Sequence, residues 1–156
     1  MGIYKIEEFG AKGDGKTINT DAIQKAIDTC NEKGGGKIIL SGGIFKTGTI
    51  ELKSNVQLHL EPGCKIVGSE NLNDYKDLEM SGFSIENIEP SMELTKNALI
   101  IAGESENISI TGYGEINGSG LSFYKNTPYD ENGKYNKPDI PRPRIIMFYK
   151  CKNVFI

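Results

Sequence analysis

The sequence predicts an all-β protein, a right-handed single-stranded parallel β-helix with an N-terminal capping α-helix. Three observations support this fold class. Only residues 20–33 repeat apolar side chains at a helical period. After residue 36, short alternating runs are separated by Gly, Asn or Pro. A run that begins with Asn also recurs at intervals of roughly fifty residues, about two β-helix coils. The 19 glycines agree with many tight corners.

The expected helix has one apolar stripe. Ile23, Ala26, Ile27 and Cys30 fall at i, i+3, i+4 and i+7. Asn19 or Thr20 is suited to cap its first turn, where Asp21 faces the positive end of the helix dipole, and the glycines at 34–36 end it.

The remaining elements are predicted to be short strands joined by turns, with a glycine-rich turn at residues 10–15. No helix-length crossover separates the strands, which argues against a doubly wound α/β fold. The expected strands are residues 3–9, 37–40, 49–52, 56–60, 65–67, 98–101, 108–110, 115–117, 145–149 and 154–156.

Three asparagines introduce the repeated runs: Asn55, Asn107 and Asn153. Asn tolerates the left-handed backbone conformation that a sharp corner requires, and its side chain can bond to a neighbour. Asparagines at the same corner of successive coils are therefore expected to stack into a ladder.

Residues 1–156 are interpreted as the N-terminal part of one β-helix domain. Two polar segments, about 70–95 and 121–144, interrupt the pattern and are expected to project as loops. Loops of that length in a compact domain are usually functional or disordered.

Composition excludes several classes of function. The formal net charge of −3 argues against a nucleic-acid partner. No apolar run is long enough to span a membrane. The first six residues lack a signal-peptide pattern, which favours a cytoplasmic protein and leaves secretion open. Three widely spaced cysteines lack metal-ligand spacing, so no metal or cofactor is expected.

Six runs carry a family resemblance. FGAKGDGKT at 9–17, NTDAIQKAI at 19–27 and GGG at 34–36 look like the opening of pectin-degrading β-helix enzymes. LKSNVQLHL at 52–60, ITGYGEING at 110–118 and RPRIIMFYKCKNV at 142–154 follow in the same order. Together they resemble glycoside hydrolase family 28, the polygalacturonases.

The resemblance implies inverting hydrolysis of α-1,4 galacturonosidic bonds in pectin, with no cofactor. The family uses carboxylates from Asn-Thr-Asp and Asp-Asp motifs, followed by Gly-His-Gly and Arg-Ile-Lys. The one Asn-Thr-Asp here, at residues 19–21, lies where a helix begins, and His59 is flanked by leucines. No catalytic residue is therefore assigned. The chain is expected to be an inactive fragment whose catalytic residues lie beyond residue 156.

Substrate-binding candidates lie near the second polar segment. Arg142 and Arg144 could hold galacturonate carboxylates through their planar guanidinium groups. Tyr124, like Tyr129 and Tyr135, could stack on a sugar ring. The alternative is that the arginines anchor the loop to the coil and the tyrosines only pack.

Two other functions stay open. GAKGDGKT at residues 10–17 satisfies the P-loop pattern, which predicts a nucleotide-binding module. A non-catalytic β-helix that binds acidic polysaccharide or serves in assembly is the other. The last expected strand runs to residue 156, so self-association through an open final coil is also expected.

Overall fold

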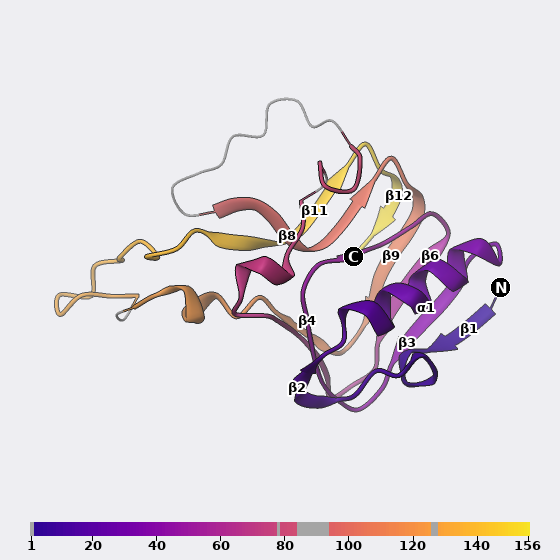
Figure 1. The fold of residues 1–156 in the computed structure, drawn as a ribbon, viewed down its shortest axis with the longest axis horizontal. Coiled ribbons are helices and arrows are strands. Elements are labelled where there is room, and N and C mark those ends of the chain that lie inside the picture. The colour runs from indigo at the N-terminus through magenta and orange to yellow at the C-terminus, as the bar shows by residue number, and fades with distance from the viewer. Residues whose placement is uncertain (1, 78, 84–93, 126–127) are drawn as a thin grey trace.

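The computed structural model describes residues 2–77, 79–83, 94–125 and 128–156. The chain winds through short strands around a common core, with one helix alongside (Figure 1). The elements are β1 Gly2–Lys5, η1 Ile6–Phe9, β2 Asp14–Ile18, α1 Thr20–Glu32, β3 Gly36–Leu40, β4 Gly43–Thr47, β5 Ile50–Glu51, β6 Val56–Leu60, β7 Cys64–Gly68, η2 Leu72–Asp74, β8 Leu94–Gly103, β9 Glu106–Gly112, β10 Glu115–Asn117, η3 Gly120–Phe123, β11 Arg142–Tyr149 and β12 Lys152–Phe155.

The strands form three sheets, and every pairing between them is parallel. Sheet A has the order β1-β3-β6-β9-β12, sheet B β10-β7-β4-β2 and sheet C β11-β8-β5. Successive strands visit the sheets in turn, so each full circuit adds one coil. The predicted right-handed parallel β-helix is confirmed.

The core consists of inward side chains that stack from coil to coil. In sheet C, for example, Ile50 pairs with Ile100, which pairs with Ile146. The first two are fully buried and the third packs against them. Equivalent stacks in the other sheets are Ile38, Leu58 and Ile110, and Phe45, Ile66 and Ile116.

The predicted asparagine ladder is present. Asn55, Asn107 and Asn153 all have positive φ, between 52° and 64°. The Asn107 side-chain amide donates to Asn55 Oδ1 at 2.9 Å, and that of Asn153 donates to Asn107 Oδ1 at 3.0 Å. The ladder holds the turn between sheets C and A in register over three coils.

Side chains of α1 complete the free edge of sheet C. The Gln24 carboxamide accepts from the Glu51 amide at 2.8 Å and donates to the Glu51 carbonyl at 3.1 Å, as a neighbouring strand would. Thr20 accepts from the amide of Gly48, and Asn31 donates to the carbonyl of Ser54. The stripe at Ile23, Ala26, Ile27 and Cys30 is buried, as its spacing predicted.

Several elements differ from the sequence prediction. Only the first part of 3–9 is a strand, because Ile6–Phe9 forms a 3-10 turn that buries Ile6. Strands β2 and β4 were missed, since the glycines at 13, 15, 42 and 43 hide the alternation. No helix among the described residues is long and apolar enough to cross a membrane.

Substitutions at Asn107 can separate two effects on the free energy of unfolding: the hydrogen bonds of the ladder and the strain of a positive φ. We expect Asn107→Gly to lower the free energy of unfolding by about 1–2 kcal/mol, because two hydrogen bonds are lost. Asn107→Ala should cost roughly 1 kcal/mol more, because its Cβ is disfavoured at this positive φ. Urea unfolding of both variants measures the difference. Equal values would contradict a strained corner at this residue.

Candidate functional site

The P-loop pattern does not form a phosphate site. Lys16 and Thr17 lie within β2 rather than at the start of a helix. The backbone amides of both residues already bond to Asp14 Oδ1, at 2.9 and 2.8 Å. Amides that would hold phosphate in a P-loop are thus occupied by a carboxylate of the same turn, so the nucleotide-binding hypothesis is wrong for this segment.

The Asn-Thr-Asp at residues 19–21 has a structural role, although a different one from the cap that was predicted. Asn19 is 2 % exposed and makes no side-chain cap bond. Its Oδ1 accepts from the Lys12 amide at 2.7 Å. Its Nδ2 donates to the carbonyls of Lys12, Thr17 and Lys46. Asn19 therefore ties the glycine-rich turn to β4.

His59 also has a structural partner. It lies on the outer face of sheet A, half-buried, with Nδ1 2.8 Å from Thr111 Oγ1 of the adjacent strand. The Gln57 amide donates to the same hydroxyl at 2.8 Å. Among the described residues, no group of three His, Cys, Asp or Glu side chains could hold a metal ion.

The best candidate site is a cavity of about 400 Å³ where β10 ends and β11 begins. We call it the arginine pocket. Its volume lies in the range of roughly 300–1,000 Å³ that small-molecule sites occupy. The lining residues are Gly118, Gly120, Arg142, Pro143, Arg144, Ile145 and Ile146. Two of the three predicted binding residues therefore line one cavity.

A register shift at the start of β11 positions the two arginines. Arg142 pairs with Leu94 of β8, but Arg144 pairs with Ala98. Between these two pairs, β8 therefore contains more residues than β11. Such irregularities redirect side chains and are common beside functional sites. Here the shift falls between the two cations of the pocket.

Arg142 is held by the tyrosines of the preceding segment. Its Nη2 donates to the Tyr135 hydroxyl at 3.1 Å, and its guanidinium carbon lies 5.8 Å from the centre of the Tyr124 ring. The two tyrosine hydroxyls are 2.7 Å apart. For Arg142 the structure thus supports the anchoring alternative, with Tyr124 as one of its contacts.

Arg144 differs from Arg142 in its contacts, because no described residue forms a hydrogen bond with its guanidinium group. Both side chains are half-buried, and the Nε of Arg144 is buried, as is that of Arg142. No ion pair joins it to a carboxylate in that part of the chain. A partly desolvated cation without a counter-ion favours binding of an anion, because burial of an unpaired charge is costly.

Two glycines that the sequence analysis did not select leave space for the pocket. A Cβ on Gly118 would lie 3.1 Å from Ile145 Cγ1, and one on Gly120 would lie 3.7 Å from Arg142 Cδ. Neither glycine has φ in the left-handed region. The packing requires a small residue at Gly118, whereas a Cβ at Gly120 would make an ordinary van der Waals contact. The run GSG at 118–120, just after a strand, was the available signal.

The comparisons with known proteins agree with this fold. The sequence model of the rhamnogalacturonase A/epimerase, pectate lyase-like family matches residues 3–118. The chain belongs to this family. It is also 41% identical over 121 residues to an exo-poly-alpha-D-galacturonosidase of Dickeya chrysanthemi, covering 76% of this chain and 20% of that protein.

Solved structures extend the likeness over the whole chain. A hyperthermoactive exopolygalacturonase of Thermotoga maritima superposes with a TM-score of 0.71 at 25% identity, covering 98% of this chain and 40% of that one. A family 28 exopolygalacturonase of Yersinia enterocolitica gives 0.68 at 26% identity, covering 98% and 33%. The predicted resemblance to glycoside hydrolase family 28 is confirmed. The pectate lyase-like chain spans about a fifth of the length of its curated relative from Dickeya chrysanthemi.

The occupied amides of Lys16 and Thr17 have a consequence that can be measured. Hydrogen bonds from these amides and from the Thr17 hydroxyl lower the pKa of Asp14 from 3.8 to about 2. Because the folded pKa is depressed, the stabilisation is complete above pH 3.8 and is lost as the pH falls toward 2. Carboxyl ¹³C NMR titration should show this value. Thr17→Val, which keeps both amides, should raise the Asp14 pKa part of the way to 3.8, whereas no rise would contradict the role of the hydroxyl.

Proposed function

We propose that this chain forms coils of a galacturonan-acting glycoside hydrolase and binds a galacturonate carboxylate of the substrate at Arg144. Two of its relatives are named for action on polygalacturonate, and the third is a family 28 exopolygalacturonase. Every residue of galacturonan carries a carboxylate unless it is esterified. A site for this polymer therefore needs cations at positions that a sugar ring can reach.

The observation that carries the proposal is the charge of the arginine pocket. Two guanidinium groups line it, and no carboxylate does. Arginine offers parallel N–H donors that fit a carboxylate in a bidentate pair. Arg142 is already oriented by Tyr135 and Tyr124, whereas the guanidinium group of Arg144 has no hydrogen bond to a described residue. Arg144 is thus the better candidate for the carboxylate, with Arg142 as its neighbour.

The same lining argues that this pocket binds but does not cleave. Inverting hydrolysis needs one carboxylic acid and one carboxylate, roughly 6.5–9.5 Å apart, to protonate the leaving oxygen and to activate water. The pocket supplies neither group. We therefore propose that bond cleavage takes place outside this pocket and that the pocket has a role in holding the substrate.

Arg144→Ala tests the carboxylate contact. We expect it to weaken binding of a galacturonate oligomer by about 10- to 100-fold, because a charge-assisted hydrogen bond contributes about 1.5–3 kcal/mol. Arg144→Lys should recover only part of the affinity, since an ammonium cannot form the bidentate pair. Isothermal titration calorimetry at low salt measures all three proteins.

Two controls make this binding experiment specific. The fully methyl-esterified oligomer has the same sugars without the charges. It should bind the wild type as weakly as the unesterified oligomer binds Arg144→Ala. Lys152→Ala removes an exposed cation of β12, outside the pocket, and should leave affinity unchanged. Equal loss in Arg144→Ala and Lys152→Ala would reduce the effect to net charge and would overturn the proposal.

Reducing-sugar release from polygalacturonate separates binding from cleavage. We expect no release by this chain, because the arginine pocket lacks an acid–base pair. Binding without release supports a substrate-holding role. Release that survives Arg144→Ala but is abolished in Asp21→Asn would show that the Asn-Thr-Asp at the start of α1 is catalytic and that cleavage was placed wrongly.

A further inference from the structure

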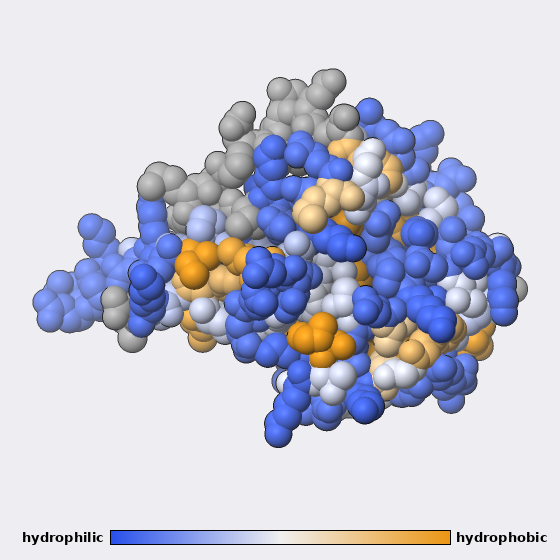
Figure 2. Space-filling model, in the orientation of Figure 1, coloured by the Kyte–Doolittle hydropathy of each residue, from blue (hydrophilic) through white to orange (hydrophobic). Residues whose placement is uncertain are grey.

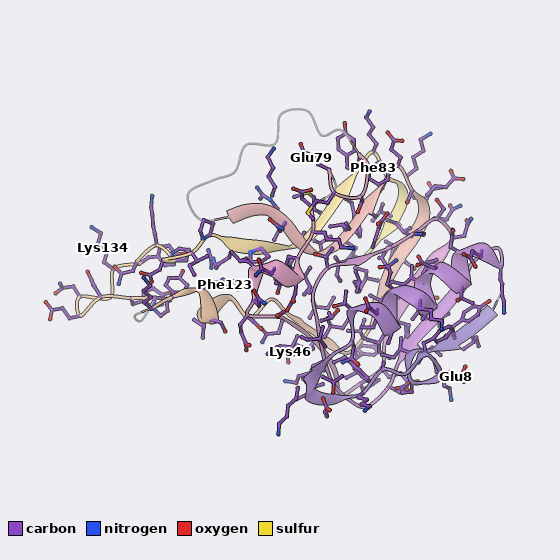
Figure 3. All side chains as sticks on the ribbon, viewed as in Figure 1. Glu8, Lys46, Glu79, Phe83, Phe123 and Lys134 are labelled. Atoms are coloured by element: carbon purple, nitrogen blue, oxygen red, sulfur yellow. The ribbon has the colours of Figure 1, made fainter. Side chains whose placement is uncertain are left out.

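The chain from Leu121 of η3 to the start of β11 projects beside the arginine pocket. We call it the arm, residues 121–125 and 128–141. It extends away from the coils (Figure 1), with Phe123 at its base and Lys134 at its far end (Figure 3). Phe123 is 2 % exposed, and its carbonyl accepts from the Asp139 amide at 3.1 Å. This bond joins the outgoing and returning parts of the arm at its base, where Phe123 is buried.

The far part of the arm is a closed hairpin. Tyr129 and Tyr135 form an antiparallel bridge, and Asp130 exchanges backbone bonds with Lys134 and Gly133. The Asp130 carboxylate also accepts from the amides of Asn132 and Lys134, at 2.9 and 2.8 Å. These contacts form the hairpin within the chain itself, so a ligand would not have to order it.

Tyrosine rings form a continuous cluster along the arm. The ring centres of Tyr124 and Tyr135 are 6.4 Å apart, and those of Tyr129 and Tyr135 are 6.2 Å apart, both edge-on. Tyr129 and Tyr135 nevertheless remain 57% and 42% exposed. Tyr124 lies under Arg142, so the cluster begins at the arginine pocket and continues outward.

The excess of positive charge around the arm comes from the pocket. Residues 121–141 contain three Lys and three Asp or Glu, and the two arginines of the pocket raise the count for 121–144 to five cations against three acids, whereas the protein has a formal net charge of −3. Two of those three acids, Asp130 and Asp139, already accept backbone N–H bonds within the arm. Its surface is largely hydrophilic (Figure 2), as expected of a region that meets a polar ligand.

We propose that the arm binds further sugar units of an acidic polysaccharide whose first carboxylate sits in the arginine pocket. The inference rests on the proposed function and adds a second binding region to it. Exposed tyrosine faces suit the apolar C–H faces of sugar rings, and the surrounding cations suit carboxylates repeated along the chain. Continuity between pocket and arm favours one polymer occupying both.

This arrangement makes affinity depend on the length of the ligand. A monosaccharide fills the pocket alone, whereas a longer oligomer also contacts Tyr129 and Tyr135. A few side chains, often Tyr, Trp or Arg, commonly contribute most of the binding energy of an interface. The arm is therefore expected to increase the affinity for each added sugar unit and to leave the affinity for the monomer unchanged.

The test is a series of dissociation constants for galacturonate monomer to hexamer by calorimetry at low salt. We expect wild-type affinity to rise with length. Tyr129→Ala, which removes an exposed ring of the hairpin, should reduce hexamer affinity about tenfold and leave monomer affinity as it was. Tyr113→Ala, an 89% exposed tyrosine of the turn between β9 and β10, is the matched control and should change neither.

The outcomes separate the two proposals. Monomer binding that depends on Arg144 but does not strengthen with length supports the pocket and overturns the arm. Length-dependent binding that Tyr129→Ala abolishes but Arg144→Ala does not supports the arm and overturns the pocket. A length dependence equally affected by Tyr113→Ala overturns the arm, and no binding of any oligomer overturns both.

Discussion

Hydrogen bonding between coils is the constraint on which the rest of this structure depends. Among the described strands, none pairs with the strand that follows it in the chain; β3, for example, bonds to β1 on one side and to β6 on the other. A slip of one residue would turn the stacked interior side chains outward, since successive side chains of a strand point to opposite faces. The asparagine ladder opposes such a slip at the corners where β6, β9 and β12 begin. At the free edge of sheet C, the Gln24 carboxamide forms the hydrogen bonds with β5 that a strand of another coil would form.

The candidate site follows from this stacking. Because β10 lies in sheet B and β11 in sheet C, a wall of one sheet meets a wall of the next where the arm leaves and rejoins the coils. The glycines of 118–120 keep this junction open, and the register shift in β11 places Arg142 and Arg144 there. The coils thus hold the pocket, while the arm between β10 and β11 supplies its aromatic neighbours. Binding residues on loops held by a rigid scaffold are a general arrangement.

The parts that sequence could predict are those set by local pattern. The apolar stripe of α1 and the asparagines at 55, 107 and 153 each signal their role within a few residues. Strands β2 and β4 were not predicted, because glycines interrupt their alternation and their pairing partners are distant in sequence. Asn19 was misjudged for the same reason, since one of its bonds reaches Lys46. Arg142 and Arg144 could be selected by residue type, but the partners of one and the unpaired Nε of the other depend on contacts that only the fold creates.

A weakly acidic protein can bind an acidic polymer when its charges are segregated. The acidic residues of α1, among them Asp21, Asp28 and Glu32, lie on the helix at the other side of the molecule from the arm (Figure 1). At physiological salt the screening length is about 8 Å, so exposed charges farther away than this contribute little. A polyanion at the arm therefore interacts mainly with the lysines of the arm and with the two guanidinium groups of the pocket, which supply the local excess of positive charge.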